Sequence, residues 1–157
     1  MKKQLKLLAL LVSCVLFVSI TSAKAEPKTI TAELIIDELV TIVNGEPQIP
    51  MMFAPFIENG RAMVPTNFLN EAFMLKIDWE GLSKIITLTN GKTVIELQTN
   101  NKTVKVNGKE VQIDSPPIIR NGRTAYPIRF IMETFGATVT WDSILHKATI
   151  VYELPEE

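Results

Sequence analysis

Residues 59–79 read NGRAMVPTNFLNEAFMLKIDW, and residues 121–141 read NGRTAYPIRFIMETFGATVTW. The two stretches share the pattern N-G-R-x3-P-x2-F-x2-E-x-F-x5-W, with 8 identities in 21 ungapped positions. Composition alone would give about one or two identities. Val43-Asn44-Gly45 recurs as Val106-Asn107-Gly108 at an offset of 63 instead of 62. The sequence therefore indicates a duplicated unit of about 55 to 60 residues, and two such units can bury their apolar faces against each other.

Turn signals punctuate both copies at matching places. Asn107-Gly108 and Asn121-Gly122 are typical of tight turns, because asparagine and glycine tolerate positive φ. Each first turn is followed by a proline-containing stretch, at 50–55 in the first copy and at Pro116 and Pro117 in the second. Proline lacks the N–H that a central strand donates, so we expect these stretches at a sheet edge or in a crossover.

A short helix follows the second turn in each copy. A strand at 124–126 leads into Pro127, and proline suits the first turn of a helix because its missing N–H would be unpaired there. The next apolar residues fall on one helical stripe: Ile128, Ile131, Met132 and Phe135. Gly136 stands where a left-handed residue is wanted. The first copy has Met74 there, so we expect its helix to end with more strain.

Strands surround each helix. Alternation at 75–79 and 137–141 leads through a polar turn to closing strands at 85–89 and 148–152, and the segments 93–97 and 103–106 form further strands. The order of strands, one helix and strands, repeated twice, predicts an α+β fold with antiparallel sheet. We divide the chain into a degenerate repeat at 39–98 and a second repeat at 99–157, packed as one unit.

The N-terminal region has the features of a secretory signal. Lys2 and Lys3 precede an apolar run, and Ala23-Lys24-Ala25 provides a small-x-small cleavage pattern, so residues 1–25 are expected to be removed. An uncleaved anchor, or lipidation of Cys14 after Leu11-Val12-Ser13, is disfavoured, the latter because the apolar run continues past the cysteine. Residues 26–38 are then a leader and first strand. Alternation favours a strand that ends at Val43, although a helical face through Leu34 and Leu39 also fits.

Charge and cysteine content exclude several classes of function. Cleavage at residue 25 leaves 12 Lys and Arg against 17 Asp and Glu, a net charge of −5, and no cysteine. An acidic chain without a basic tract is a poor match for nucleic acid or for anionic lipid. Stability outside the cell must then come from packing without disulfides, and no later segment is long enough to insert in a membrane.

The two tryptophans have two interpretations. Trp79 and Trp141 each follow an apolar residue in an alternating strand, which favours core packing at the end of the strand. The alternative makes them a stacking platform for sugars.

The charged residues at matched positions also have ordinary roles. Glu71 and Glu133 are the matched carboxylates that a paired-carboxylate hydrolase would need in one cleft, and a solvent-facing glutamate on a short helix is the favoured interpretation. Arg61 and Arg123 follow a turn and are expected to bond loop carbonyls or the helix glutamates in preference to an anion.

His146 is the single histidine of the chain, four residues after Asp142. One imidazole and one carboxylate fall short of a zinc or copper site, and they do not make a serine or cysteine nucleophile system. The sequence also lacks a glycine-rich phosphate loop. We therefore expect no metal, no cofactor and no enzyme activity.

The second copy closely resembles the copper amine oxidase N-terminal-like domain, a module common in secreted and surface proteins of Gram-positive bacteria. The matching residues are Val106-Asn107-Gly108-Lys109, Pro116-Pro117-Ile118-Ile119, Asn121-Gly122-Arg123-Thr124, Tyr126-Pro127-Ile128-Arg129-Phe130, Glu133, Phe135-Gly136-Ala137, Val139 and Trp141-Asp142. In the first copy Asn67 stands where the family has its arginine, and Met74-Leu75 replace Gly-Ala. The resemblance implies an α+β module with twisted antiparallel sheet curled against a helix. Oxidase chemistry belongs to a separate catalytic domain of those proteins.

The sequence thus predicts a secreted or cell-wall-associated, non-catalytic binding module whose partner is a cell-wall polymer, polysaccharide or surface protein. An accessory subunit or small hydrolase that uses the paired glutamates is the alternative. Candidate binding residues are Arg123, Arg129 and Trp141. The residues expected to specify the fold are Asn107, Gly108, Pro117, Gly122, Pro127, Phe130, Gly136 and Trp79.

Overall fold

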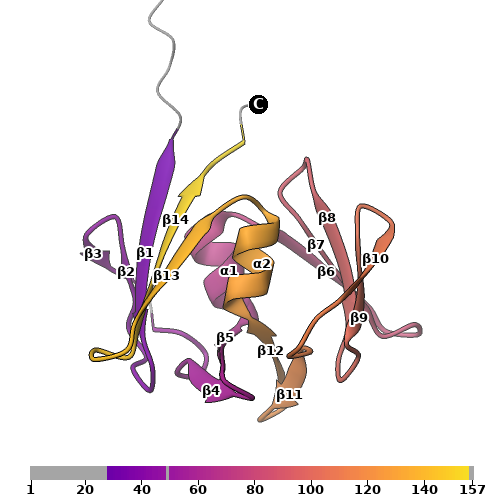
Figure 1. Ribbon diagram of the computed structural model, residues 1–157, viewed down its shortest axis with the longest axis horizontal. Coiled ribbons are helices and arrows are strands. Elements are labelled where there is room, and N and C mark those ends of the chain that lie inside the picture. The colour runs from indigo at the N-terminus through magenta and orange to yellow at the C-terminus, as the bar shows by residue number, and fades with distance from the viewer. Residues whose placement is uncertain (1–27, 49, 156–157) are drawn as a thin grey trace, which may run out of the picture.

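The computed structural model describes residues 28–48 and 50–155. The expected signal segment and Cys14 lie outside these residues. The described chain forms three antiparallel sheets and two short helices, α1 (Thr66–Phe73) and α2 (Ile128–Thr134) (Figure 1). Neither helix has the length and apolar character needed to span a membrane, and the described residues contain no other helix that does.

Two five-stranded sheets flank the helices, and a smaller four-stranded sheet lies below them in the view of Figure 1. The first sheet has the order β13 (Thr138–Asp142), β14 (Lys147–Glu153), β1 (Thr29–Ile35), β2 (Ile42–Val43) and β3 (Glu46–Pro47). The second has the order β10 (Lys109–Gln112), β9 (Thr103–Val106), β8 (Val94–Gln98), β7 (Ile85–Thr89) and β6 (Lys76–Glu80). The small sheet has the order β11 (Ile118–Arg120), β12 (Arg123–Pro127), β5 (Arg61–Pro65) and β4 (Phe56–Glu58).

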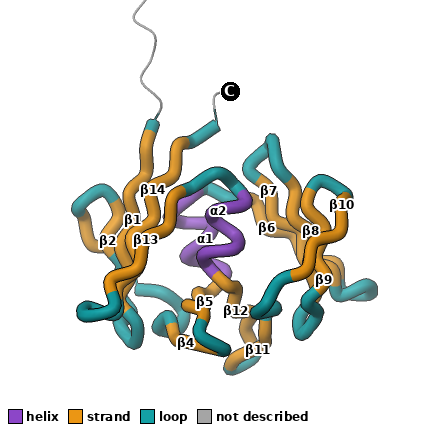
Figure 2. Tube along the Cα trace, in the orientation of Figure 1, coloured by secondary structure: helices purple, strands orange, loops and turns teal. Residues whose placement is uncertain are grey.

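The first and last strands of the described chain, β1 and β14, are neighbours within the first sheet. β1 pairs with β14 along its whole length, from Thr29 opposite Glu153 to Ile35 opposite Lys147. Figure 2 shows these two strands side by side, with the helices in the middle of the molecule. In the second sheet the corresponding neighbours, β7 and β8, are consecutive in sequence. The chain therefore closes on itself, because the segment before the first quoted stretch completes the sheet built by the end of the second.

The small sheet joins the two quoted stretches through a symmetric register. Val64 lies opposite Tyr126, and Met63 and Pro65 lie opposite Pro127 and Ala125. Val64 and Tyr126 occupy the same position in the two stretches, 62 residues apart. The pairing of β5 with β12 is therefore symmetric about that residue pair, as in a two-fold interface between equal partners.

One main hydrophobic core connects both large sheets and both helices. The helices contribute buried residues from the predicted stripe of α2 and from Phe68, Leu69, Ala72 and Phe73 of α1. Phe73 meets both Phe68 and Tyr152 edge-on, with ring centroids 5.4 and 6.0 Å apart. These contacts tie α1 to β14, the last strand of the chain. A smaller cluster of Phe56, Met63 and Ala125 lies in the small sheet.

Two local expectations need correction. The first strand expected within residues 26–38 is present as β1, Thr29–Ile35, but only Ile42 and Val43 of the later strand expected to end at Val43 form β2. The helical alternative for this region is also wrong. Pro65 and Pro127 end strands β5 and β12 and stand just before the helices, so they are the residues that precede the first turn and are not part of it. The proline-containing stretches do precede the edge strands β4 and β11, as their missing N–H groups require.

Candidate functional site

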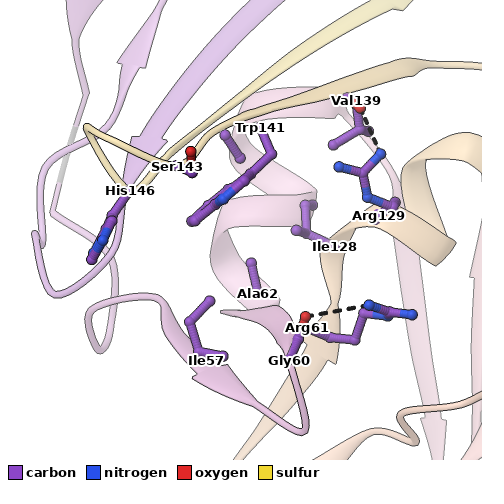
Figure 3. Close-up of a pocket in the computed structure, with 11 residues that line it drawn as sticks. Ile57, Gly60, Arg61, Ala62, Ile128, Arg129, Val139, Trp141, Ser143 and His146 are labelled. Atoms are coloured by element: carbon purple, nitrogen blue, oxygen red, sulfur yellow. Dashed lines mark hydrogen bonds between the residues drawn. The ribbon is translucent and has the colours of Figure 1, made fainter.

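A groove of about 480 Å³ lies between α2, β13 and the small sheet, and we call it the Trp141 groove (Figure 3). β4, β5 and the turn between them form one side, through Ile57, Gly60, Arg61 and Ala62. The other side consists of Ile128, Arg129, Val139, Trp141, Ser143, His146 and Ala148. Residues from both quoted stretches therefore build this one groove.

Trp141 projects over the groove and is 39% exposed, so the prediction of a core position is wrong. Its indole ring stacks with the imidazole of His146, with centroids 6.4 Å apart and planes 22° from parallel. Trp79 is more exposed still, at 67%. Val139, two residues before Trp141 and on the same side of β13, is buried. The alternation was correct, but the strand continues beyond the part that the core covers, so its last apolar side chain lies in the open.

Arg129 comes from the first turn of α2 and caps the groove. Its Nη1 donates to Oε1 of Glu133 at 3.0 Å and to the carbonyl of Val139 at 2.7 Å. The second bond satisfies an outward carbonyl of β13, an edge strand, which makes that edge less available for pairing. In the first stretch the same position is Asn67, whose Oδ1 accepts from the N–H of Met52 at 3.3 Å.

Arg61, at the start of β5, lines the groove on the side of the small sheet. It donates to the carbonyl of Gly60 at 3.3 Å, as the sequence predicted for a loop carbonyl, and it forms an ion pair with Asp114. The hydrogen bond from Arg61 lowers the pKa of Asp114, so this carboxylate stays charged at neutral pH. Because both arginines of the groove are paired with carboxylates, the lining carries little net charge.

The turn that holds His146 is fixed by Asp142. Its Oδ1 accepts hydrogen bonds from the backbone N–H groups of Ile144 and Leu145 at 2.9 and 3.0 Å. These two bonds lower the pKa of Asp142. His146 ends the turn in a left-handed conformation with φ +48°, which brings the imidazole back beside Trp141.

A second groove of about 480 Å³ lies beside Trp79, and we call it the Trp79 groove. Its lining is Trp79, Lys84, Thr99, Ile119, Gly122 and Thr124. Five of these six residues stand 62 positions from residues that line the Trp141 groove: Trp141, His146, Ile57, Gly60 and Ala62. In each groove the tryptophan comes from one quoted stretch, whereas the isoleucine and glycine belong to the other.

Arg123 and Glu71, the other residues considered as candidates from the sequence, line neither groove. Nη1 of Arg123 lies 3.1 Å from the sulfur of Met52, at the position that corresponds to Asp114 opposite Arg61. Glu71 lines a small hollow on α1 beside Met51 and Phe68. The structure thus brings Arg129 and Trp141 into one groove, and it places Arg123 outside the lining of both.

Most of the expected fold residues lie at turns and element ends, whereas Trp79 lies in β6 and Phe130 within α2. Asn107 and Gly108 have φ +49° and +78°, and Asn107 Oδ1 also accepts from the N–H of Val94 at 2.8 Å, which anchors β8. Gly122 and Gly136 have φ +73° and +92°. Pro117 accepts through its carbonyl from the N–H of Asn100 at 2.7 Å. Phe130 packs, partly buried, against the main core.

Ile57, Ile119 and the stacking partner of Trp141 were not predicted from the sequence. Ile57 and Ile119 stand two residues before each Asn-Gly-Arg, so extending the alignment of the two stretches upstream would have found them. The stacking of His146 on Trp141 has no such signal, because the first copy has Lys84 at that position. Among residues 28–48 and 50–155, no group of three or more His, Cys, Asp or Glu side chains is placed to hold a metal ion.

Comparison with protein families gives a match to the copper amine oxidase N-terminal domain over residues 22–150. The chain belongs to this family. The match covers both quoted stretches in one alignment, and most of the described fold. The copper amine oxidase N-terminal domain is a non-catalytic domain, which agrees with a groove that has aromatic, aliphatic and paired ionic side chains. No curated protein matches the chain.

Proposed function

We propose that this member of the copper amine oxidase N-terminal domain family is a secreted, non-catalytic binding module of the bacterial cell envelope. Its ligand is an uncharged glycan chain of the wall, held in the Trp141 groove. The observation that carries the proposal is the exposure of Trp141 at the wall of an open groove. A partly exposed indole beside polar groups in a groove is a surface of the kind that contacts small ligands.

The chemistry of the lining favours a sugar. A pyranose ring has a flat face of C–H groups, which matches the indole of Trp141, and a rim of hydroxyl groups. Ser143, His146 and Arg129 provide donors and acceptors around that aromatic surface. Ile57 and Val139 add apolar contact on the two sides of the groove.

The charge balance selects an uncharged polymer over an acidic one. Arg61 and Arg129 are the fixed cations of the lining, and each already pairs with a carboxylate, Asp114 or Glu133. An acidic ligand would have to compete with those carboxylates, whereas hydroxyl groups can use the other N–H donors of a guanidinium. Binding is therefore expected to depend weakly on salt.

The test is co-sedimentation of residues 26–157 with Gram-positive peptidoglycan stripped of its anionic polymers, at 50 mM and 500 mM NaCl. We expect the chain to sediment with the glycan at both salt concentrations. Trp141→Ala should weaken binding at least tenfold, about 1.4 kcal/mol. Leu39→Ala is the matched control, because Leu39 is 47% exposed and lines neither groove.

Two results would reject the proposal. The first is no sedimentation of the wild-type chain under either condition, which would direct the search to a protein partner. The second is equal loss in the Leu39→Ala and Trp141→Ala chains, which would make the tryptophan irrelevant. Circular dichroism of each variant establishes that a loss of binding is not a loss of fold.

A further inference from the structure

The Trp79 groove copies the Trp141 groove at five positions of its lining. The tryptophan of one groove stands 62 positions from the tryptophan of the other, and the same separation holds for the isoleucine and the glycine that face each ring. Both grooves have a volume of about 480 Å³. The two grooves thus correspond on both sides: on the side of the tryptophan and on the opposite side, where the isoleucine and the glycine lie.

Each groove needs both stretches of the chain. Trp141 faces Ile57 and Gly60 of the first stretch, and Trp79 faces Ile119 and Gly122 of the second. The symmetric pairing of β5 with β12 explains this exchange, since it sets the turn before each of these strands beside the other stretch's tryptophan. A single unit would therefore make neither groove.

We infer that the chain has two quasi-equivalent glycan sites, one at Trp141 and one at Trp79, and that it holds two glycan segments at once. This inference rests on the proposed function, because it assigns the same ligand class to the second groove. The Trp79 groove has no carboxylate in its lining, and Lys84, Thr99 and Thr124 surround the indole with polar groups. Trp79 is also the more exposed of the two rings.

The surroundings of the two tryptophans differ in one respect. His146 stacks on Trp141, whereas Lys84 stands at the corresponding position beside Trp79. The ring of Trp79 lies over Gly81 instead, where an added Cβ would come within 3.3 Å of it. Gly81 thus leaves room for the ring, and Ser143 takes the equivalent place in the other groove. The Trp79 groove therefore has the indole ring but has a lysine in place of the histidine that stacks on Trp141.

The two sites lie on opposite flanks of the molecule. β4 and β13, which border the Trp141 groove, are on the left in Figure 1, and β11 and β6 are on the right. A polymer with many repeats can be held at two places or joined to a second chain, which raises its apparent affinity over that of an oligomer.

The experiment follows the two indole N–H signals in a ¹⁵N-labelled sample of residues 26–157 during titration with chitotetraose, an uncharged probe. The chain has only two tryptophans, so each signal reports one groove. Trp79→Phe and Trp141→Phe assign the signals and retain an aromatic ring. We expect both signals to shift and to saturate, and each single variant to keep the shift of the remaining signal.

The outcomes separate the two claims. A saturable shift of the Trp141 signal with a stationary Trp79 signal overturns the second site and leaves the proposed function intact. Two stationary signals overturn both. As a second readout, the wild-type chain should cross-link soluble glycol chitin into a turbid suspension, and either Trp→Ala variant should reduce that turbidity at least tenfold; equal turbidity in all three proteins contradicts a two-site chain.

Discussion

At the scale of single residues, the two helix ends solve one geometric problem with different side chains. Gly136 follows α2 with φ +92°, and Met74 follows α1 with φ +58°. Glycine adopts positive φ without a steric cost, whereas methionine pays one. The α1 end is supported by its own contacts: Met74 N–H donates to the carbonyl of Asn70, and the Asn70 side chain donates to the carbonyl of Leu75, both at 2.9 Å.

Gly136→Val should therefore lower the free energy of unfolding by about 1 kcal/mol or more. No atom lies within 4 Å of a Cβ at this position, so the cost comes from the backbone and not from a clash. Met74→Gly is the reciprocal change and should stabilise by a few tenths to about 1 kcal/mol, because Met74 is 62% exposed and little packing is lost. Urea unfolding of both variants measures this. Equal stabilities for Gly136→Val and wild type would show that the left-handed conformation is unimportant.

At the scale of elements, the strands that pair with their sequence neighbours were the easiest to predict. β7 and β9 begin and end at the residues expected from alternation and turn signals. β1 lies within residues 26–38, where a first strand was expected, but its exact bounds and the shortness of the strand that ends at Val43 could not be predicted, because the partner strand β14 lies more than a hundred residues away. β1 forms as a strand because it pairs with β14, and the local sequence pattern gives no sign of that pairing.

The closure of the first sheet by β1 is open to a direct test. Leu34 is 1% exposed and lies opposite Ala148, whereas its neighbour Ile35 is 41% exposed. Leu34→Ala should reduce the free energy of unfolding by about 2–5 kcal/mol, because it leaves a cavity between β1 and the helices. Ile35→Ala, on the opposite face of the same strand, should cost about 1 kcal/mol or less. Chemical denaturation compares the two; equal losses would mean that β1 does not bury its inner face as described.

At the scale of the whole molecule, the site could be predicted only in part. The repeat of tryptophan, glycine and arginine was visible in the sequence. The exposure of Trp141 was not, because alternation tells which face of β13 a side chain takes and not where the covering helix ends. The grooves were also hidden, since each one joins residues from two stretches that meet only when β5 pairs with β12.

The arrangement makes the two quoted stretches depend on each other. One hydrophobic core extends through both large sheets and both helices, so the two stretches do not form two separate cores. The same pairing that builds this core also sets a turn of one stretch beside the tryptophan of the other. Loss of either stretch should thus remove both grooves together with the fold.

The most direct test of a glycan at Trp141 uses the Trp79→Phe variant, in which Trp141 is the only tryptophan of the chain. Its intrinsic fluorescence is recorded during titration with chitotetraose at low and high salt. A sugar ring on the indole should change the emission in a saturable way, with a similar dissociation constant at both salt concentrations. Unchanged emission up to millimolar probe, from a variant with the circular dichroism of the wild type, would contradict the account.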